Sequence, residues 1–130
     1  MAIKLKPKFF GPLQMKTETS GTFSYTTNAG HTARTGSPAS AEIATPADLI
    51  MAALASCISL SLEMVAQQMK VELGEICVEI NAAKALDLPS RFGSFDAVVR
   101  LEKINEEDLG NKLLQQAKQI CKYVKTVSEN

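Results

Sequence analysis

The first third of the chain consists of short segments typical of β-strands. Residues 14–19 and 22–27 are rich in threonine and aromatic residues, and Ser20-Gly21 between them predicts a tight hairpin connection. A second turn is expected at residues 28–30, where the sequence is Asn-Ala-Gly, and a further short strand at 31–35. The pattern therefore predicts a small antiparallel sheet at the start of the chain.

A loop and then one long apolar segment follow. Residues 36–45 are small, polar and include a proline, which predicts a loop. Thr45-Pro46-Ala47-Asp48 combines an N-cap residue, a first-turn proline and a capping-box carboxylate. No glycine or proline interrupts the segment before about residue 71, which predicts a long helix. It is apolar nearly all round from Leu49 to Ile58, so we expect protein to cover both of its faces.

The same segment is borderline in length for a membrane span. The window 49–66 holds a single charge, Glu63. However, the segment is rich in alanine and serine, lacks flanking Trp or Tyr, and sits between amphipathic strands. These features favour a buried central helix over insertion into a membrane.

After Gly74 the period of the pattern is two. Alternate positions 76, 78 and 80 are aliphatic, whereas Cys77, Glu79 and Asn81 point to the other face of the predicted strand. A turn is expected at Asp87–Ser90, and then a second strand. Its inward face is predicted to consist of Phe95, Ala97, Val99 and Leu101.

The last element is predicted to be an amphipathic helix. Asn105 is its expected N-cap, and the acidic residues 106–108 fall in its first turn, where the helix dipole favours negative charge. The buried stripe is predicted to run through Leu109, Leu113, Ala117, Ile120, Cys121 and Val124.

The order of these elements predicts an α+β fold in one domain over residues 1–130. Antiparallel sheets would pack around the long helix, with the amphipathic helix added to them. A chain of 130 residues has little surface with which to wrap both faces of such a helix, so a partner subunit is expected to supply the rest.

The composition of the chain limits the classes of partner and the cellular location to be expected. The chain has 14 Lys+Arg and 14 Asp+Glu, and no basic run or interleaved aromatic stripe, which argues against a nucleic-acid partner. The first residues carry scattered lysines and two prolines rather than a signal-peptide core. We therefore expect a cytoplasmic protein, in which disulfides are usually transient and catalytic.

The three cysteines are the candidate chemistry. Cys57, Cys77 and Cys121 show no paired-ligand spacing, and His31 is the single histidine, so no metal site is expected. Cys57 and Cys121 fall on predicted buried helix faces, where they are either small core residues or a redox pair. Cys77 is predicted on the polar face of its strand and is given no chemical role.

Residues 45–71, TPADLIMAALASCISLSLEMVAQQMKV, resemble the central-helix signature of the OsmC/Ohr family. That family has a P-x-E/D-L opening, a stretch rich in alanine and glycine, and then a cysteine. LLQQAKQIC, ending at Cys121, resembles the family's second helix, which ends at the second cysteine. The resemblance covers about residues 14–127, including the two intervening strands.

The resemblance implies an intertwined homodimer with two equivalent sites at the subunit interface. Many members of the family reduce organic hydroperoxides without a cofactor, using an external thiol or dithiol as reductant. By position, Cys57 would be the peroxidatic cysteine and Cys121 the resolving cysteine.

Such chemistry requires a positive charge beside Cys57, because only the thiolate attacks and burial disfavours it. Arg34 lies in the region where the family places its site arginine. The alternative is a solvated arginine at a strand edge. Asp48 is the candidate carboxylate to hold Arg34, although it also completes a capping box. Nine helical residues place Asp48 and Cys57 on opposite faces, so a joint role requires a bend or a site shared between chains.

The chain departs from the family pattern at two positions. Ala47 stands where peroxidase members have a glutamate, and Lys122 where members have a proline after the second cysteine. The segment AIKLKPKF near the start would have to replace a missing terminal strand, unless that strand is very short. The alternatives to a peroxidase are a dimer that binds a small apolar ligand in the interface cleft, or a purely structural dimer.

Overall fold

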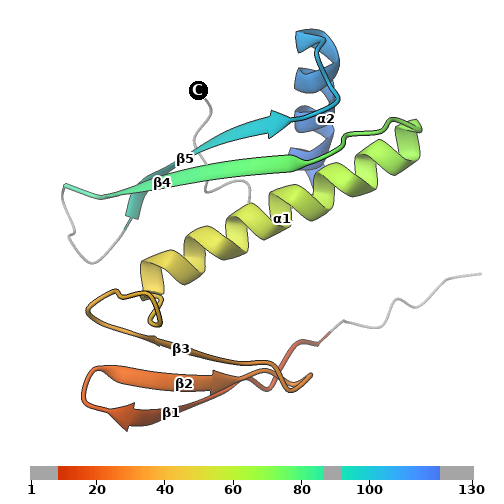
Figure 1. Ribbon diagram of the computed structural model, residues 1–130. Helices are drawn as coiled ribbons and strands as arrows, with labels where there is room; N and C mark the ends of the chain where they lie inside the picture. Colours follow the sequence, from red (N-terminus) through yellow and green to blue (C-terminus); the bar gives the residue numbers. More distant parts are fainter. Residues whose placement is uncertain (1–8, 87–91, 121–130) are drawn as a thin grey trace, which may run out of the picture. The chain divides into compact units, whose positions relative to one another are not determined.

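The computed structural model describes residues 9–86 and 92–120, with only the backbone of Gln119 and Ile120 (Figure 1). The chain separates into two compact units, residues 1–46 and 47–130. Each unit is described separately.

The first unit is a three-stranded antiparallel sheet in the order β1-β2-β3. Its strands are β1 (Gln14–Thr19), β2 (Thr22–Thr26) and β3 (Thr32–Gly36). Gly21 has a positive φ of 84° in the turn between the first two strands, which explains why the hairpin signal contains a glycine. The predicted initial sheet is confirmed.

The loop after β3 is tied back to that strand. The Thr35 hydroxyl donates a hydrogen bond to the Ala44 carbonyl oxygen at 2.7 Å, and the Gly36 amide donates to the same oxygen at 3.1 Å. A Cβ at position 36 would collide with the carbonyl oxygen of Gly21. The close approach of the backbone at Gly36 to that at Gly21 therefore requires glycine at position 36. The two hydrogen bonds to Ala44 hold the loop beside the sheet.

The second unit contains α1 (Pro46–Met69), β4 (Ile76–Lys84), β5 (Phe92–Leu101) and α2 (Glu107–Ile120). The helix α1 begins at the predicted proline. It ends at Met69, the following Lys70 has a left-handed φ of 58°, and the Val71 amide donates to the Ala66 carbonyl oxygen. The long helix is therefore confirmed, with a definite C-terminal cap.

β4 and β5 form an antiparallel pair that runs alongside α1 (Figure 1). The register pairs Val78 with Val99 and Ile80 with Ala97. These four residues are partly buried against the core, as the alternating pattern predicted. β4 extends three residues beyond the predicted face and β5 begins at Phe92, whereas the expected turn at Asp87–Ser90 lies outside the described residues.

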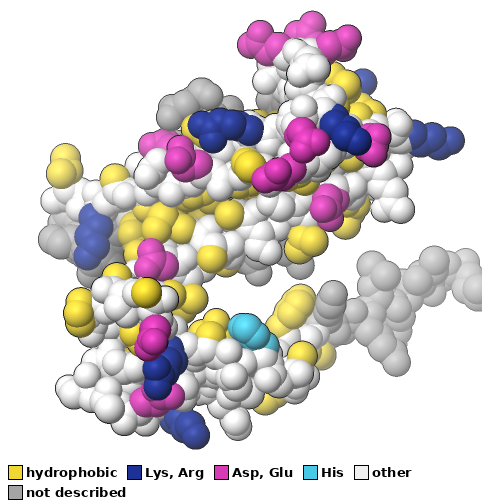
Figure 2. All heavy atoms as spheres, viewed as in Figure 1, with side chains coloured by type: hydrophobic (Ala, Val, Ile, Leu, Met, Phe, Trp, Pro, Cys, Tyr) yellow, Lys and Arg dark blue, Asp and Glu magenta, His cyan; other side chains and the backbone are white. Residues whose placement is uncertain are grey.

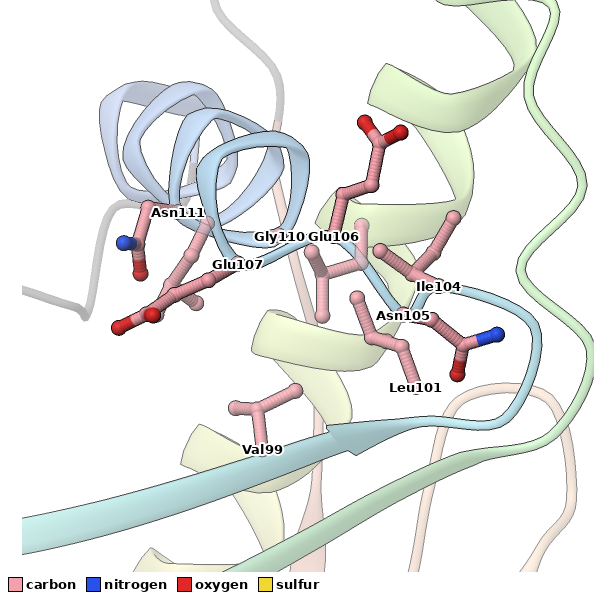
Figure 3. Close-up of a pocket in the computed structure, with 10 residues that line it drawn as sticks. Val99, Leu101, Ile104, Asn105, Glu106, Glu107, Gly110 and Asn111 are labelled. Carbon is pink, nitrogen blue, oxygen red and sulfur yellow. The ribbon is translucent and has the colours of Figure 1, made fainter.

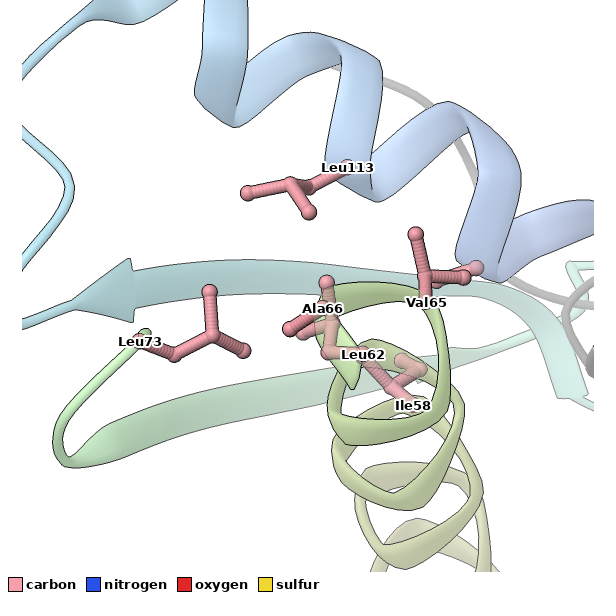
Figure 4. Packing of buried hydrophobic residues seen from close by; sticks show 7 residues of the cluster. Ile58, Leu62, Val65, Ala66, Leu73 and Leu113 are labelled. Carbon is pink, nitrogen blue, oxygen red and sulfur yellow. The ribbon is translucent and has the colours of Figure 1, made fainter. Parts of the chain in front are cut away.

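The core of the second unit lies where α1 meets α2 and the sheet. Figure 4 shows α1 side chains directed toward α2 and β5, with Leu113 opposite Val65. Leu62, Val65 and Leu113 are fully buried. The core cluster consists of Ile58, Leu62, Val65, Ala66, Leu73, Leu113 and Ala117.

The remaining face of α1 is open in the single chain. Ile50, Leu60 and Met64 are exposed, with Leu60 at 63%. The helix is long and apolar enough to cross a membrane by length and composition, a property shared by core helices of soluble proteins, and it contributes six buried residues to this unit. Within the second unit, one face of α1 is covered and the other is not.

The amphipathic helix α2 begins slightly later than predicted. Its first helical hydrogen bond joins the Gly110 amide to the Glu106 carbonyl oxygen, and the helix is assigned from Glu107. This places Asn105 one residue before the capping position. Leu113 and Ala117 are buried and Leu109 partly so, whereas the side chain of Ile120 and all of Cys121 and Val124 are not described.

Candidate functional site

Cys57 is a half-buried residue in the middle of α1, and it is disulfide-bonded. Its side chain packs against the core cluster. At helical spacing, Ala53 and Leu60 are its neighbours on the face of α1 turned away from Leu62. Cys57 therefore lies at the boundary between the core and the exposed apolar stripe, rather than deep inside the core.

Cys121, the predicted partner of Cys57, lies outside the described residues. The pairing of these two cysteines stays a prediction. Cys57 itself is disulfide-bonded in the structure, so it does not serve only to fill the core.

Arg34 lies on β3, at an edge of the first unit's sheet, and forms two ion pairs. Its Nε atom is 2.9 Å from Oε2 of Glu18, and its Nη1 atom is 3.5 Å from Oε2 of Glu42. The Arg34 side chain is 51% exposed. The guanidinium is thus held between a strand carboxylate and a loop carboxylate, while half of it remains open to solvent.

Glu18 and Glu42 were not singled out from the sequence. Glu18 is 16 residues before Arg34 and becomes its neighbour only through the pairing of β1, β2 and β3. The register pairs Lys16 with Ser24 and Ser24 with Arg34, which places Glu18 close to that row. A correct sheet register was the signal that would have identified this contact.

Asp48 lies in the first turn of α1, where its negative charge interacts favourably with the helix dipole. It belongs to the second unit, as does Cys57, whereas Arg34 belongs to the first. The approach of Arg34 to Cys57, and the role of Asp48 in orienting Arg34, stay predictions. The carboxylates that contact Arg34 within its own unit are Glu18 and Glu42.

Cys77 is an exposed free thiol on the outer face of β4. Its Sγ donates a hydrogen bond to Oε1 of Glu75 at 3.4 Å. This bond and the charge of Glu75 raise the pKa of the Cys77 thiol, and Arg100 on β5 opposes the shift. A thiol held protonated is a poor nucleophile, and the assignment of no chemical role to Cys77 stays a prediction.

The described residues contain no group of three or more His, Cys, Asp or Glu side chains arranged to hold a metal ion.

The model of the OsmC-like protein family matches residues 39–130, which include the long helix and everything after it. The chain belongs to the OsmC-like family. Among curated proteins no match is found.

Solved structures of OsmC/Ohr proteins share the fold. An OsmC-like protein from Mycoplasma pneumoniae is similar with a TM-score of 0.80 at 9% identity, covering 96% of this chain and 95% of that one. The organic hydroperoxide resistance protein OhrB of Bacillus subtilis gives 0.64 at 19% identity, with 90% and 89% covered. An organic hydroperoxide resistance protein from Elizabethkingia anophelis gives 0.67 at 17% identity, with 93% and 89% covered.

These likenesses confirm the predicted α+β fold with antiparallel sheets and two helices. Membership of the OsmC-like family is consistent with α1 being a core helix rather than a membrane span.

Proposed function

We propose that the protein is a thiol-dependent redox protein that reduces organic hydroperoxides, with Cys57 as the peroxidatic cysteine and Cys121 as the resolving cysteine. The observation that carries the proposal is that Cys57 is disulfide-bonded at a partly buried position on α1. Membership of the OsmC-like family and structural neighbours named as organic hydroperoxide resistance proteins support it.

The reaction begins with the Cys57 thiolate. Its sulfur attacks the terminal oxygen of the hydroperoxide, the S–O bond forms as the O–O bond breaks, and the alkoxide leaves as an alcohol after taking a proton. The Cys57 sulfenic acid then condenses with the Cys121 thiol, which forms the disulfide and releases water. An external thiol or dithiol reduces the disulfide by exchange and is itself oxidised, and no cofactor is required.

Arg34 is assigned the role of stabilising the thiolate. Its side chain is half exposed and its guanidinium is held by two carboxylates, so a fixed and accessible positive charge is present in the first unit. In this proposal, a third charge-assisted contact from Arg34 would favour the thiolate of Cys57. Asp48 would orient Arg34 in the same arrangement, although capping of α1 accounts for its position equally well.

The test is thiol counting and mapping after treatment with one equivalent of an organic hydroperoxide. The reduced protein should lose two thiols and keep Cys77. Peptide mapping should find Cys57 joined to Cys121, and Cys121→Ser should accumulate a Cys57 sulfenic acid that a dimedone probe traps. Cys77→Ser is the matched control and should react at the wild-type rate.

Survival of all three thiols in excess hydroperoxide would instead favour the second candidate function. In that case the protein would be a dimer that binds a small apolar ligand in its interface cleft. The exposed apolar residues of α1, together with Ala47 in place of the family's glutamate, are the observations that favour it.

We further propose that the protein is a cytoplasmic homodimer. Ile50, Leu60 and Met64 on the open face of α1 are exposed in the single chain, and a second copy would bury them. Sedimentation at micromolar concentration should detect a dimer, and Leu60→Glu should weaken it by placing a charge in the interface. Glu63→Gln, next to it on the helix, is the control. A monodisperse wild-type monomer would contradict the dimer.

A further inference from the structure

A cavity of about 210 Å³ opens between the end of β5 and the beginning of α2. Its described lining residues all belong to the second unit, and neither Cys57 nor Cys77 is among them. Its apolar part is formed by Leu62, Val99, Leu101, Ile104 and Leu114. Figure 3 shows Val99 and Leu101 directed from β5 toward the beginning of α2. Neither the OsmC-like resemblance nor the proposed peroxidase reaction uses this cavity.

The polar part of the cavity is acidic. Glu107 and Asn111 are four residues apart on α2, and Figure 3 shows both side chains extending on the same side of the helix. Glu106 points away from Val99 in the same view. Within residues 9–86 and 92–120, Glu107 has no ion pair, and neither lysine nor arginine lines the cavity.

Gly110 keeps this space open. It lies inside α2, where glycine is less favourable than alanine, and it lines the cavity. A Cβ at this position would meet only the Ile104 Cγ2 atom, at an ordinary contact distance of 3.8 Å. Neither backbone strain nor packing therefore requires glycine here. The absence of a side chain at Gly110 leaves an unfilled space near the Glu107 carboxylate.

We propose that this cavity binds a small primary amine that carries a short alkyl chain. The ammonium group donates hydrogen bonds to the Glu107 carboxylate and to the Asn111 side-chain oxygen, while the alkyl chain contacts Val99 and Ile104. Acidic side chains gather over the beginning of α2 in Figure 2, which favours a cation over an anion. The volume is below the range of about 300–1,000 Å³ for drug-sized ligands, so the ligand has few heavy atoms.

The simpler role for Glu107 is to stabilise α2 through the favourable interaction of its negative charge, in the first turn, with the helix dipole. Asp108 occupies the same turn and does not line the cavity, which makes it the matched comparison. A dipole role predicts similar behaviour for both residues, whereas a ligand role concerns Glu107 alone.

The experiment is a titration of the full chain with n-hexylamine, followed by backbone amide chemical shifts and calorimetry. Shifts should change at Val99, Ile104 and Asn111. Glu107→Gln should weaken hexylamine binding by about tenfold or more, because a charge-assisted hydrogen bond is lost. Asp108→Asn should leave binding unchanged, and hexanoate should not bind.

A second variant tests the cavity itself without changing its charge. Gly110→Leu fills the cavity without removing a charge and should also abolish binding, with melting curves confirming that each variant is folded. Unchanged shifts with hexylamine, or an equal loss in Glu107→Gln and Asp108→Asn, would overturn the proposal. Cys57→Ser should bind the amine normally, which keeps this inference separate from the proposed peroxidase activity.

Discussion

The Nε atom of Arg34 lies 2.9 Å from Oε2 of Glu18, so a side chain on β3 reaches across β2 to the first strand of the sheet. The 3.5 Å contact with Glu42 attaches the loop after β3 to the same guanidinium. The orientation of Arg34 therefore depends on the register of all three strands.

Arg34→Ala should slow alkylation of Cys57 in the reduced protein at neutral pH. If Arg34 stabilises the thiolate, about tenfold less thiolate is present for each 1.4 kcal/mol that is lost. The rate of hydroperoxide consumption should fall in parallel. Stopped-flow alkylation with Cys77→Ser as background measures the effect. Unchanged Cys57 reactivity with a weakened fold would make Arg34 a structural residue.

Glu18→Gln should lower the free energy of unfolding by about 0.2–1 kcal/mol, the usual range for an exposed ion pair. Glu42→Gln, whose contact is longer and whose side chain is 79% exposed, should cost less. Both effects should shrink at high salt, because exposed charges are screened. Urea unfolding at two salt concentrations provides the measurement, and a larger cost for Glu42→Gln would reverse the assigned order of the two contacts.

Glu75→Gln should lower the pKa of Cys77, because it removes both the hydrogen-bonding carboxylate and the charge that raise it. Alkylation of Cys77 should then reach half its maximal rate at a lower pH than in the wild type. Arg100→Gln should shift the profile the other way, since Arg100 lowers this pKa. Glu79→Gln, on the same face of β4, is the control and should leave the profile in place.

Leu62→Ala should destabilise the protein by about 2–5 kcal/mol, because it leaves a cavity among fully buried side chains. Leu86→Ala, at a fully exposed position, should change stability by no more than about 0.5 kcal/mol. Thermal or urea unfolding distinguishes the two. Similar costs for both substitutions would contradict the assigned core.

Gly110→Ala should stabilise the protein by about 0.5–1 kcal/mol, because alanine is the better helix former and its Cβ meets no close atom. Gly74→Ala should have the opposite effect. Gly74 has a φ of 70°, and its Cβ would approach Lys103 and Glu102 side-chain atoms within 3.0 Å. Melting temperatures of the two variants provide the comparison, and destabilisation by Gly110→Ala would mean that the helix packs more tightly there than the structure indicates.

The predictable parts of the fold were those in which local chemistry and periodicity agree. Alternation in β4 and β5 assigned the inward face because a strand has only two faces. Pro46 placed the start of α1, since proline is favoured in the first turn and disfavoured further inside. The start of α2 was less well placed because local sequence signals define a helix end only to within one or two residues.

The candidate site was predictable to a smaller extent. The family pattern pointed to Cys57, and its disulfide agrees with a redox role for that residue. The ion pairs of Arg34 were not predictable, because Glu18 and Glu42 are distant in sequence and no local pattern joins them to β3. The cavity at α2 was missed as well, since no local sequence pattern marks Gly110 as lining a cavity.

By itself the sequence determined the order of elements, the inward faces of β4, β5 and α2, and the family, because periodicity and turn chemistry act over a few residues. Only the tertiary structure decided which face of α1 is buried. That helix is apolar nearly all round, so its own pattern does not distinguish Leu62, which is fully buried, from Leu60, which is exposed. The choice depends on where β4, β5 and α2 pack, and such long-range contacts are a property of the folded chain.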